Sequence, residues 1–319
     1  MKAYVRDRYG SPDVLRLEEV DKPELTDGGA LVRVRATSIN AHDWHMLRGK
    51  PYIARLDEGL RRPKSTILGL DVAGVVEAVG ANVTDLKPGD EVFGSRSGAF
   101  AEYVSGRNLV KMPAGLTFEQ AAAVSVAGQT ALQGLRDKGG LQAGQRVLVN
   151  GAGGGVGTFA VQIAKALGAD VTAVTSTRNV DLALSIGANH VVDYTRDDFT
   201  RGGQRYDLIL DIGGNRRLPS MRRALTPEGT VVLVAPQPGQ WIGPVVRVIG
   251  ALLTSRIGRQ RVQPFLSAVS RGDLLVLREL IEAGKVTPVI DRTYPFAELP
   301  EAIRHVEAGH ARGKVVVTL

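Results

Sequence analysis

The stretch VLVNGAGGGVGTFAVQIAKALGA, residues 147–169, decides the fold. A short apolar segment leads into a run of glycines and then into a helix whose apolar residues recur every three or four positions, which marks one buried face. Glycines leave backbone amides bare ahead of the positive end of a helix, and a dinucleotide pyrophosphate needs such amides. The loop residues that we expect to bind a dinucleotide are Gly151, Gly153, Gly154, Gly155, Val156 and Gly157.

Strand and helix patterns alternate on both sides of this loop. Strands are expected at residues 146–150, 171–175, 191–193, 208–211 and 231–235, with helices at 158–167, 180–186 and 218–225. This alternation predicts an α/β fold, a Rossmann domain with a doubly wound parallel sheet. Gly213 and Gly214 follow one of the strands, at the carboxyl edge where ligands of such sheets bind.

The first 120 residues have a different pattern. Short alternating strands at 31–36, 72–79, 91–94 and 100–105 are separated by Gly, Pro and Asp turns, which predicts a small antiparallel barrel or sandwich. After residue 263 we expect helices at 274–283 and 298–308 and a last strand at 314–319, a tail that returns to the first domain. The predicted domains are therefore 1–124, 125–262 and 263–319.

The residues after the second Rossmann strand bear on the choice of cofactor. An NAD site places a carboxylate there, on the ribose 2′-hydroxyl. This sequence instead has Ser176 and Arg178, and an arginine suits a 2′-phosphate because it is permanently charged and can bind in two places. We therefore expect NADPH in preference to NADH.

Three segments carry a resemblance to a known family: GGVGTFAVQIAKALGA, HVVDY and GHARGKVVV. Over essentially its whole length the chain resembles the medium-chain dehydrogenase/reductase superfamily. Its likeness is greatest to the zinc-free, zeta-crystallin-like quinone oxidoreductases, especially the group of reticulon-interacting mitochondrial reductases and their bacterial relatives. The resemblance implies a GroES-like, β-rich catalytic domain beside the Rossmann domain, a homodimer, and NADPH-dependent hydride transfer to quinones or enones.

The resemblance also implies particular site residues. Asn40 and Tyr52 match positions close to the nicotinamide. Asn40 would bind the nicotinamide ribose or the substrate oxygen, and Tyr52 would steady a carbonyl oxygen, relay a proton or simply pack in the wall. The further cofactor contacts that the family suggests are Thr130, Tyr194, Val234, Ala235, Ala311, Arg312 and Gly313.

The resemblance argues against zinc. The zinc-ligand positions of the superfamily fall on Asn40 and Leu70, and the chain has no cysteine at all. His42 and His45 stand three residues apart, a spacing that permits an unrelated metal site, but no ligand partner beyond Asp43 accompanies them. We interpret the pair as pocket lining or surface and expect no metal.

Other functional classes fit the sequence less well. A short-chain dehydrogenase needs Tyr-x-x-x-Lys, which is missing. The net charge of +7 is scattered rather than clustered, so a nucleic-acid partner is not expected. Residues 241–261 form an amphipathic stretch that would pack on the core, build a dimer, shape the substrate mouth or touch a membrane transiently. A membrane partner is not expected, and a charged N-terminus and the absence of thiols indicate the cytoplasm. The alternative function is a non-enzymatic, NADPH-binding structural or RNA-binding protein of zeta-crystallin type.

Overall fold

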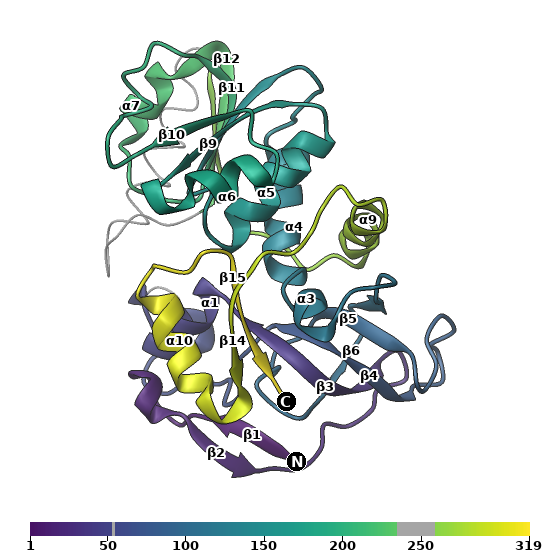
Figure 1. The fold of residues 1–319 in the computed structure, drawn as a ribbon. Helices are drawn as coiled ribbons and strands as arrows, with labels where there is room; N and C mark the ends of the chain where they lie inside the picture. The colour runs from purple at the N-terminus through teal and green to yellow at the C-terminus, as the bar shows by residue number, and fades with distance from the viewer. Residues whose placement is uncertain (53–54, 235–258) are drawn as a thin grey trace. The chain divides into compact units, whose positions relative to one another are not determined.

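The computed structural model describes residues 1–52, 55–234 and 259–319 and divides them between two compact units (Figure 1). Unit 1 comprises Met1–Gln129, Val269–Glu282 and Pro288–Leu319, and unit 2 comprises Thr130–Ala268 and Ala283–Thr287. The sequence placed the divisions after residues 124 and 262, whereas the units divide after Gln129 and Ala268. Residues 283–287 belong to unit 2 because the Gln162 side chain both donates to Thr287 O, at 3.0 Å, and accepts from Thr287 N, at 2.8 Å.

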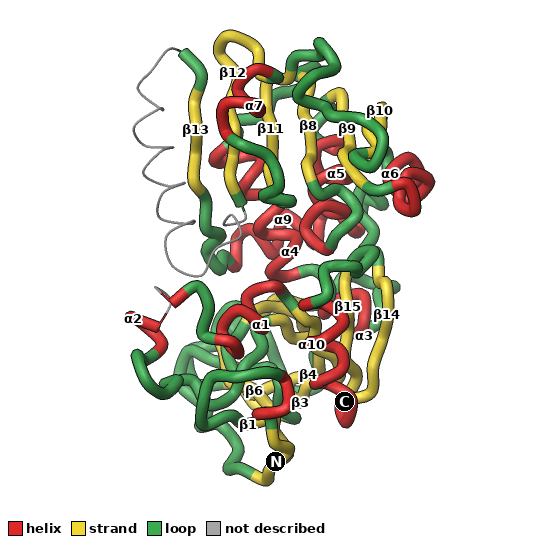
Figure 2. The backbone as a smooth tube through the Cα atoms, turned by 90° about the vertical axis from the view of Figure 1, so that its left-hand side faces the viewer, coloured by secondary structure: helices red, strands yellow, loops and turns green. Residues whose placement is uncertain are grey.

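Unit 2 is built on a parallel sheet whose described strands follow the order β10-β9-β8-β11-β12-β13 (Figure 2). Its strands are β8 (Arg146–Asn150), β9 (Asp170–Thr175), β10 (His190–Asp193), β11 (Tyr206–Asp211), β12 (Leu225–Leu233) and β13 (Arg261–Pro264). Its helices are α5 (Gly155–Ala166), α6 (Val180–Ser185) and α7 (Leu218–Arg223), with a 3-10 turn, η4 (Thr177–Asn179), before α6. The α/β prediction is confirmed.

Two element boundaries in unit 2 differ from the prediction by three residues or more. Helix α5 begins at Gly155 rather than at residue 158, because the glycines themselves form its first turn. Strand β12 begins at Leu225 rather than at residue 231, since its first residues, including the exposed Pro227 and Glu228, carry no alternating apolar pattern. Helix α4 (Ser125–Gln133) runs across the boundary between the units.

Unit 1 is β-rich. Its larger sheet follows the order β14-β15-β3-β4-β5-β7, with β6 paired to β3, and β1 and β2 form a separate antiparallel pair. The strands are β1 (Lys2–Val5), β2 (Arg16–Glu19), β3 (Ala30–Ile39), β4 (Asp71–Val79), β5 (Glu91–Ser95), β6 (Tyr103–Gly106), β7 (Leu109–Lys111), β14 (Ile290–Pro295) and β15 (Lys314–Thr318). The helices are α1 (Ala41–Arg48), α2 (Arg55–Glu58), α3 (Phe118–Ala122), α9 (Arg271–Glu282) and α10 (Leu299–Glu307).

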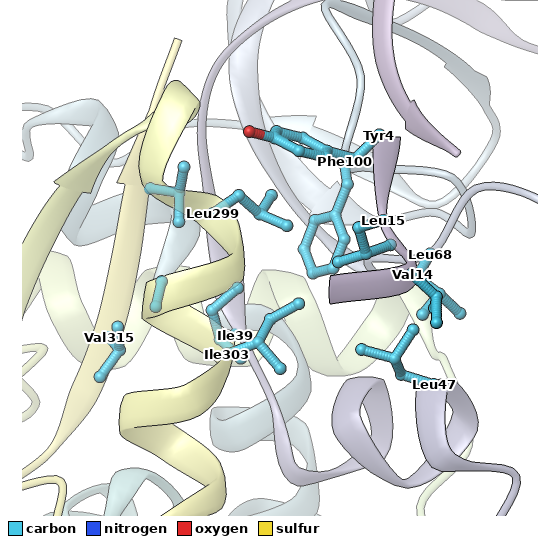
Figure 3. Close-up of a cluster of buried hydrophobic side chains, with 12 residues drawn as sticks. Tyr4, Val14, Leu15, Ile39, Leu47, Leu68, Phe100, Leu299, Ile303 and Val315 are labelled. Carbon is cyan, nitrogen blue, oxygen red and sulfur yellow. The ribbon is translucent and has the colours of Figure 1, made fainter. Parts of the chain in front are cut away.

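The tail of the chain joins unit 1 through its last strand. Strand β15 pairs antiparallel with β3, with Val315 opposite Ile39, and parallel with β14. One face of this pairing packs in a hydrophobic cluster that also holds Phe100 from the first hundred residues and Leu299 and Ile303 from α10 (Figure 3). Residues almost 300 positions apart therefore share one core, which fixes the ends of β3 and β15 beside each other.

Candidate active site

The glycine loop of unit 2 leaves strand β8 at Asn150 and turns at once into helix α5. Gly151 N and Ala152 N both donate to Val174 O, at 3.2 and 3.0 Å, so the loop is tied to the end of β9. Gly151 has a φ of +95°, a conformation that side chains disfavour. Gly154 is the N-cap of α5 and supplies no side chain to the first helical N–H groups. Bare amides at the positive end of a helix suit a pyrophosphate.

This loop lies where the strand order of the sheet reverses. Strand β8 has β9 on one side and β11 on the other, and all three are parallel, so their carboxyl ends meet at one edge. Gly213, which follows β11, donates from its N–H to Asn150 O at 3.0 Å. Ligands of doubly wound sheets bind at this position. The structure thus brings Gly213 and Gly214 beside the glycine loop.

A buried carboxylate joins the two strand ends and was missed by the sequence analysis. Asp211 Oδ1 accepts from Asn150 Nδ2 at 2.7 Å and from Gly214 N at 3.1 Å. Asn150 Nδ2 also donates to Asn215 Oδ1 at 3.0 Å. The sequence contained a signal for this contact, because Asn150 and Asp211 are polar residues that each end a strand of buried apolar residues.

The ends of β9 and β10 bring together three residues predicted to bind the adenosine end of the cofactor. Ser176 and Arg178 follow β9, and Tyr194 follows β10, with Tyr194 N donating to Thr175 O at 3.0 Å. The side chains of Arg178 and Tyr194 are exposed, so a ligand can reach them. This local group contains the cation and hydroxyls that a 2′-phosphate requires.

The structure also brings a carboxylate to this group. Asp193, the last residue of β10, accepts from Thr177 Oγ1 at 2.5 Å and from Thr195 Oγ1 at 2.7 Å. These hydrogen bonds hold the pKa of Asp193 below its usual value, and Arg196 Nε lies 3.6 Å from its Oδ2. The residues directly after β9, 176–179, include no acid. The pairing of β9 with β10 nevertheless brings the Asp193 carboxylate to this place.

The remaining predicted contacts of unit 2 lie on separate elements. Thr130, on α4, donates from its hydroxyl to Ser267 Oγ at 2.9 Å. Val234 follows β12 at the carboxyl edge, where its N–H donates to Asp211 O at 3.0 Å. Ala235 and residues 241–258 lie outside the described residues.

In unit 1, Asn40 lies in a buried polar cluster at the junction of β3 and α1. Its Oδ1 accepts from Lys314 Nζ at 2.6 Å, and its Nδ2 donates to Asp71 Oδ2 at 2.8 Å. Lys314 and Asp71 form an ion pair with side chains only 3% and 0% exposed. Ser38 Oγ also donates to Asp71 Oδ2, at 2.5 Å. The sequence analysis missed Lys314 and Asp71, although a lysine and an aspartate that open apolar strands were visible.

Tyr52 and the C-terminal loop also belong to unit 1. The Arg55 guanidinium lies 4.7 Å from the centroid of the Tyr52 ring and 4.3 Å from that of the Tyr9 ring. It therefore makes cation–π contacts with both rings. Ala311, Arg312 and Gly313 form the turn into β15, and Gly313 has a φ of +111°. Unit 1 thus carries these residues and Asn40, and unit 2 carries the other described candidates.

Comparison with known proteins places the chain in a family. Residues 26–114 match the model of the alcohol dehydrogenase GroES-like domain, and residues 186–317 match that of the zinc-binding dehydrogenases. The mitochondrial NAD(P)H oxidoreductase RTN4IP1 of Bos taurus is 34% identical over 100% of this chain and 89% of its own length. The chloroplastic NADPH-dependent alkenal/one oxidoreductase of Arabidopsis thaliana is 34% identical over 99% of this chain and 79% of its own.

A solved structure agrees with these sequence relatives. The quinone oxidoreductase from Coxiella burnetii superposes with a TM-score of 0.85 at 30% identity, covering 100% of this chain and 99% of its own. The chain belongs to the medium-chain dehydrogenase/reductase superfamily. The predicted resemblance is therefore confirmed, and the chain is an oxidoreductase that uses a nicotinamide cofactor.

The resemblance assigns the zinc-ligand positions of the superfamily to Asn40 and Leu70. Asn40 bonds to Lys314 and Asp71, and Leu70 is aliphatic. His42 is exposed, whereas His45 donates from Nδ1 to Lys50 O, 3.0 Å away, and stacks on Trp44. Within residues 1–52, 55–234 and 259–319, no three His, Asp or Glu side chains gather as a metal site would need. In the same ranges, no helix is both long and apolar enough to cross a membrane.

Proposed function

We propose that this superfamily member is an NADPH-dependent reductase that transfers hydride to quinones or to activated carbon–carbon double bonds without zinc. The observation that carries the cofactor choice is the group of Ser176, Arg178 and Tyr194 at the ends of β9 and β10. The substrate class is supported by the names of the relatives, which act on quinones or on alkenals and alkenones. A cytoplasmic location and a homodimer stay predictions.

The residues present fit a dinucleotide. Gly154 has open space where a Cβ would be, with no atom of the described residues nearer than 3.8 Å, so a phosphate can approach the start of α5. Gly213 and Gly214 line the same edge and are expected to contact the cofactor, together with Gly151, Gly153, Gly155, Val156 and Gly157. The Asp193 carboxylate beside this group stays ionised, and Arg196, whose Nε lies 3.6 Å from its Oδ2, offsets part of its charge.

The mechanism needs little acid catalysis from the protein. The nicotinamide supplies hydride when it is bound. A quinone or enone already has an electrophilic carbon, so the protein has to orient the substrate, exclude water and stabilise the oxygen that becomes negative. Asn40 is proposed to contact that oxygen. The resulting hydroquinone anion or enolate then takes a proton from water or from the Tyr52 hydroxyl.

Fluorescence titration with NADPH and NADH tests the cofactor assignment. We expect the wild type to bind NADPH more tightly, and Arg178→Ala to weaken NADPH binding by roughly 10-fold or more while leaving NADH binding unchanged, because a charge-assisted hydrogen bond is lost. Arg201→Ala is the matched control, since that exposed arginine lies on another loop of unit 2. Equal binding of the two cofactors by the wild type would refute the assignment to NADPH.

Activity is then measured as NADPH oxidation with a 1,4-quinone, an enone and an enal. Turnover of at least one class is expected, and a wild type that binds NADPH but turns over none of the three would contradict the proposed reaction. RNA binding that persists in saturating NADPH would support the non-enzymatic alternative, which the oxidoreductase relatives do not favour.

A further inference from the structure

The buried cluster around Asn40 contains a charged pair, Lys314 and Asp71, whose burial is not explained by the packing of the fold alone. Lysine and aspartate are rarely buried completely, and desolvating a lysine–aspartate pair is costly. Asn40 is the member of the cluster with the most exposed surface, 7%, against 3% for Lys314 and 0% for Asp71. Asn40 is therefore the member of the cluster that is nearest to solvent by exposed fraction, and the two charged residues are covered more completely.

Every donor and acceptor that holds Asn40 has an unambiguous chemical role. An ammonium group can only donate, so Lys314 Nζ, 2.6 Å away, must face the amide oxygen. A carboxylate can only accept, so Asp71 Oδ2, 2.8 Å away, must face the amide nitrogen. The orientation of an asparagine side chain is commonly ambiguous, but here the two partners determine it.

This orientation decides what Asn40 can offer to a ligand. One Nδ2 hydrogen is used by Asp71, and the amide oxygen is turned toward Lys314. Besides the second lone pair of that oxygen, the group that remains is the second Nδ2 hydrogen, a donor. Lys314 is itself held, because Nζ also contacts Ile39 O at 3.4 Å and Asp71 Oδ2 at 3.2 Å. Asp71 is held from its other side by Val126 N, which donates to Oδ1 at 2.8 Å.

The backbone supports the same arrangement. Val315 lies opposite Ile39 in the β3–β15 ladder, and both side chains pack in the hydrophobic cluster of Figure 3. Lys314 and Asn40 are the next residues along these two strands, so the ladder places them together. The Asn40 N–H also donates to Asp43 Oδ2 at 2.7 Å, which fixes the start of α1.

We propose, on the basis of the reductase function above, that Lys314 and Asp71 are positioning residues that fix Asn40 as a hydrogen-bond donor to the substrate carbonyl oxygen. As hydride reaches the substrate carbon, that oxygen becomes negative, and a donor held in advance stabilises it without reorganisation. The ammonium behind the amide oxygen polarises the amide and strengthens its remaining N–H as a donor. Substrates that accept hydride without forming an oxygen anion would not benefit.

A double-mutant cycle on kcat tests whether Lys314 acts through Asn40. Asn40→Ala is expected to lower kcat by about 100-fold, the usual effect of losing such a donor. Lys314→Met is expected to lower kcat at least 10-fold, with the Kd for NADPH within about twofold of wild type. In the Asn40→Ala background, Lys314→Met should have no further effect on kcat, because residues that act as a unit are not additive. Multiplying effects would overturn the proposal.

Two further variants serve as controls for the double-mutant cycle. Lys22→Met is the matched control, since Lys22 pairs with Glu77 on the exposed surface of unit 1, and its kcat should equal that of the wild type. Lys314→Met leaves the Asp71 carboxylate without its buried cation, which can prevent folding. Asp71→Asn combined with Lys314→Met removes both charges, and the folded double variant should show the same loss in kcat. Wild-type kcat in that variant would overturn the proposal.

A measurement without substrate separates this inference from the reductase function. The Asn40 side-chain amide signals in a ¹H–¹⁵N NMR spectrum are identified by their disappearance in Asn40→Ala. They should shift in Lys314→Met and not in Lys22→Met. If the wild type reduces no quinone or enone but these signals shift as expected, the proposed function fails and the positioning of Asn40 stands. Unshifted signals in folded Lys314→Met would refute the positioning itself.

Discussion

At the scale of single residues, the sharpest departure from ordinary chemistry is at Asp43. This residue lies in the first turn of α1 and is completely buried. Burial raises the pKa of Asp43 to about 7, the hydrogen bond from Asn40 N partly opposes this, and the Asp71 carboxylate adds to the increase. In the unfolded chain the same group has a pKa of 3.8. The folded state therefore holds a proton that the unfolded state has released over the interval between these values.

This difference predicts a loss of stability as the pH rises. Below pH 4 both states are protonated, so the contribution of Asp43 is complete. Between pH 4 and 7 the folded state binds more protons than the unfolded state, so the free energy of unfolding falls with pH. From pH 5 to pH 8 the loss amounts to roughly 2–3 kcal/mol. Urea unfolding at several pH values should show this slope in the wild type and its absence in Asp43→Asn, which mimics the protonated form. Parallel pH profiles for the two proteins would contradict it.

The residue scale is also where prediction from sequence was weakest. The glycines and Arg178 could be predicted as cofactor-binding residues because such a role depends on residue type and on a local pattern. Lys314, Asp71, Asp193 and Asp211 were missed because each acquires its role from a partner distant in sequence, such as Asn40, 274 positions from Lys314. Strand register creates these pairs, and register is not visible in one segment alone.

At the scale of elements, the glycine loop was predictable because one short segment contains the strand, the turn and the helix. The start of α5 was placed three residues late, since glycine is a poor helix former and gave no helical signal. The structure separates two roles among these glycines. A Cβ on Gly157 would lie 2.1 Å from Gly151 O and 2.7 Å from the Ala152 carbonyl carbon. Gly157 is thus required by the turn, whereas Gly154 borders open space.

Alanine should therefore lower stability at Gly157 and weaken cofactor binding at Gly154. Gly157→Ala forces the backbone of the loop to move and should destabilise the protein by about 1–3 kcal/mol, the usual cost of overpacking. Gly154→Ala has room, and its φ of −93° suits any residue, so the melting temperature should change little. Its methyl group would stand over the start of α5 and weaken NADPH binding. Thermal melting of both variants with and without NADPH checks this, and the prediction fails if Gly154→Ala is the less stable of the two.

At the scale of the whole molecule, the chain belongs to a superfamily with zinc-binding members, and the zinc-free chemistry proposed for it rests on two positions in unit 1. The match to the zinc-binding dehydrogenase model covers residues 186–317. This range includes strands β10 to β13 of unit 2 and the segments that return the chain to unit 1. Asn40 and Leu70, to which the resemblance assigns the zinc ligands, lie in the range 26–114 that matches the GroES-like domain model. An amide and an aliphatic side chain at these positions support the proposal of a reductase without zinc.

The proposed chemistry without zinc predicts that removing metals leaves the enzyme unaffected. A quinone or enone accepts hydride at an electrophilic carbon, so no Lewis acid is needed to release an alcohol proton. After dialysis against EDTA, the rate of NADPH oxidation and the melting temperature should match those of the untreated protein, and elemental analysis should find much less than one zinc per chain. His42→Ala serves as the control for a metal site outside the family pattern. Activity that EDTA abolishes, that zinc restores and that His42→Ala lacks would show that His42 and His45 hold a catalytic metal.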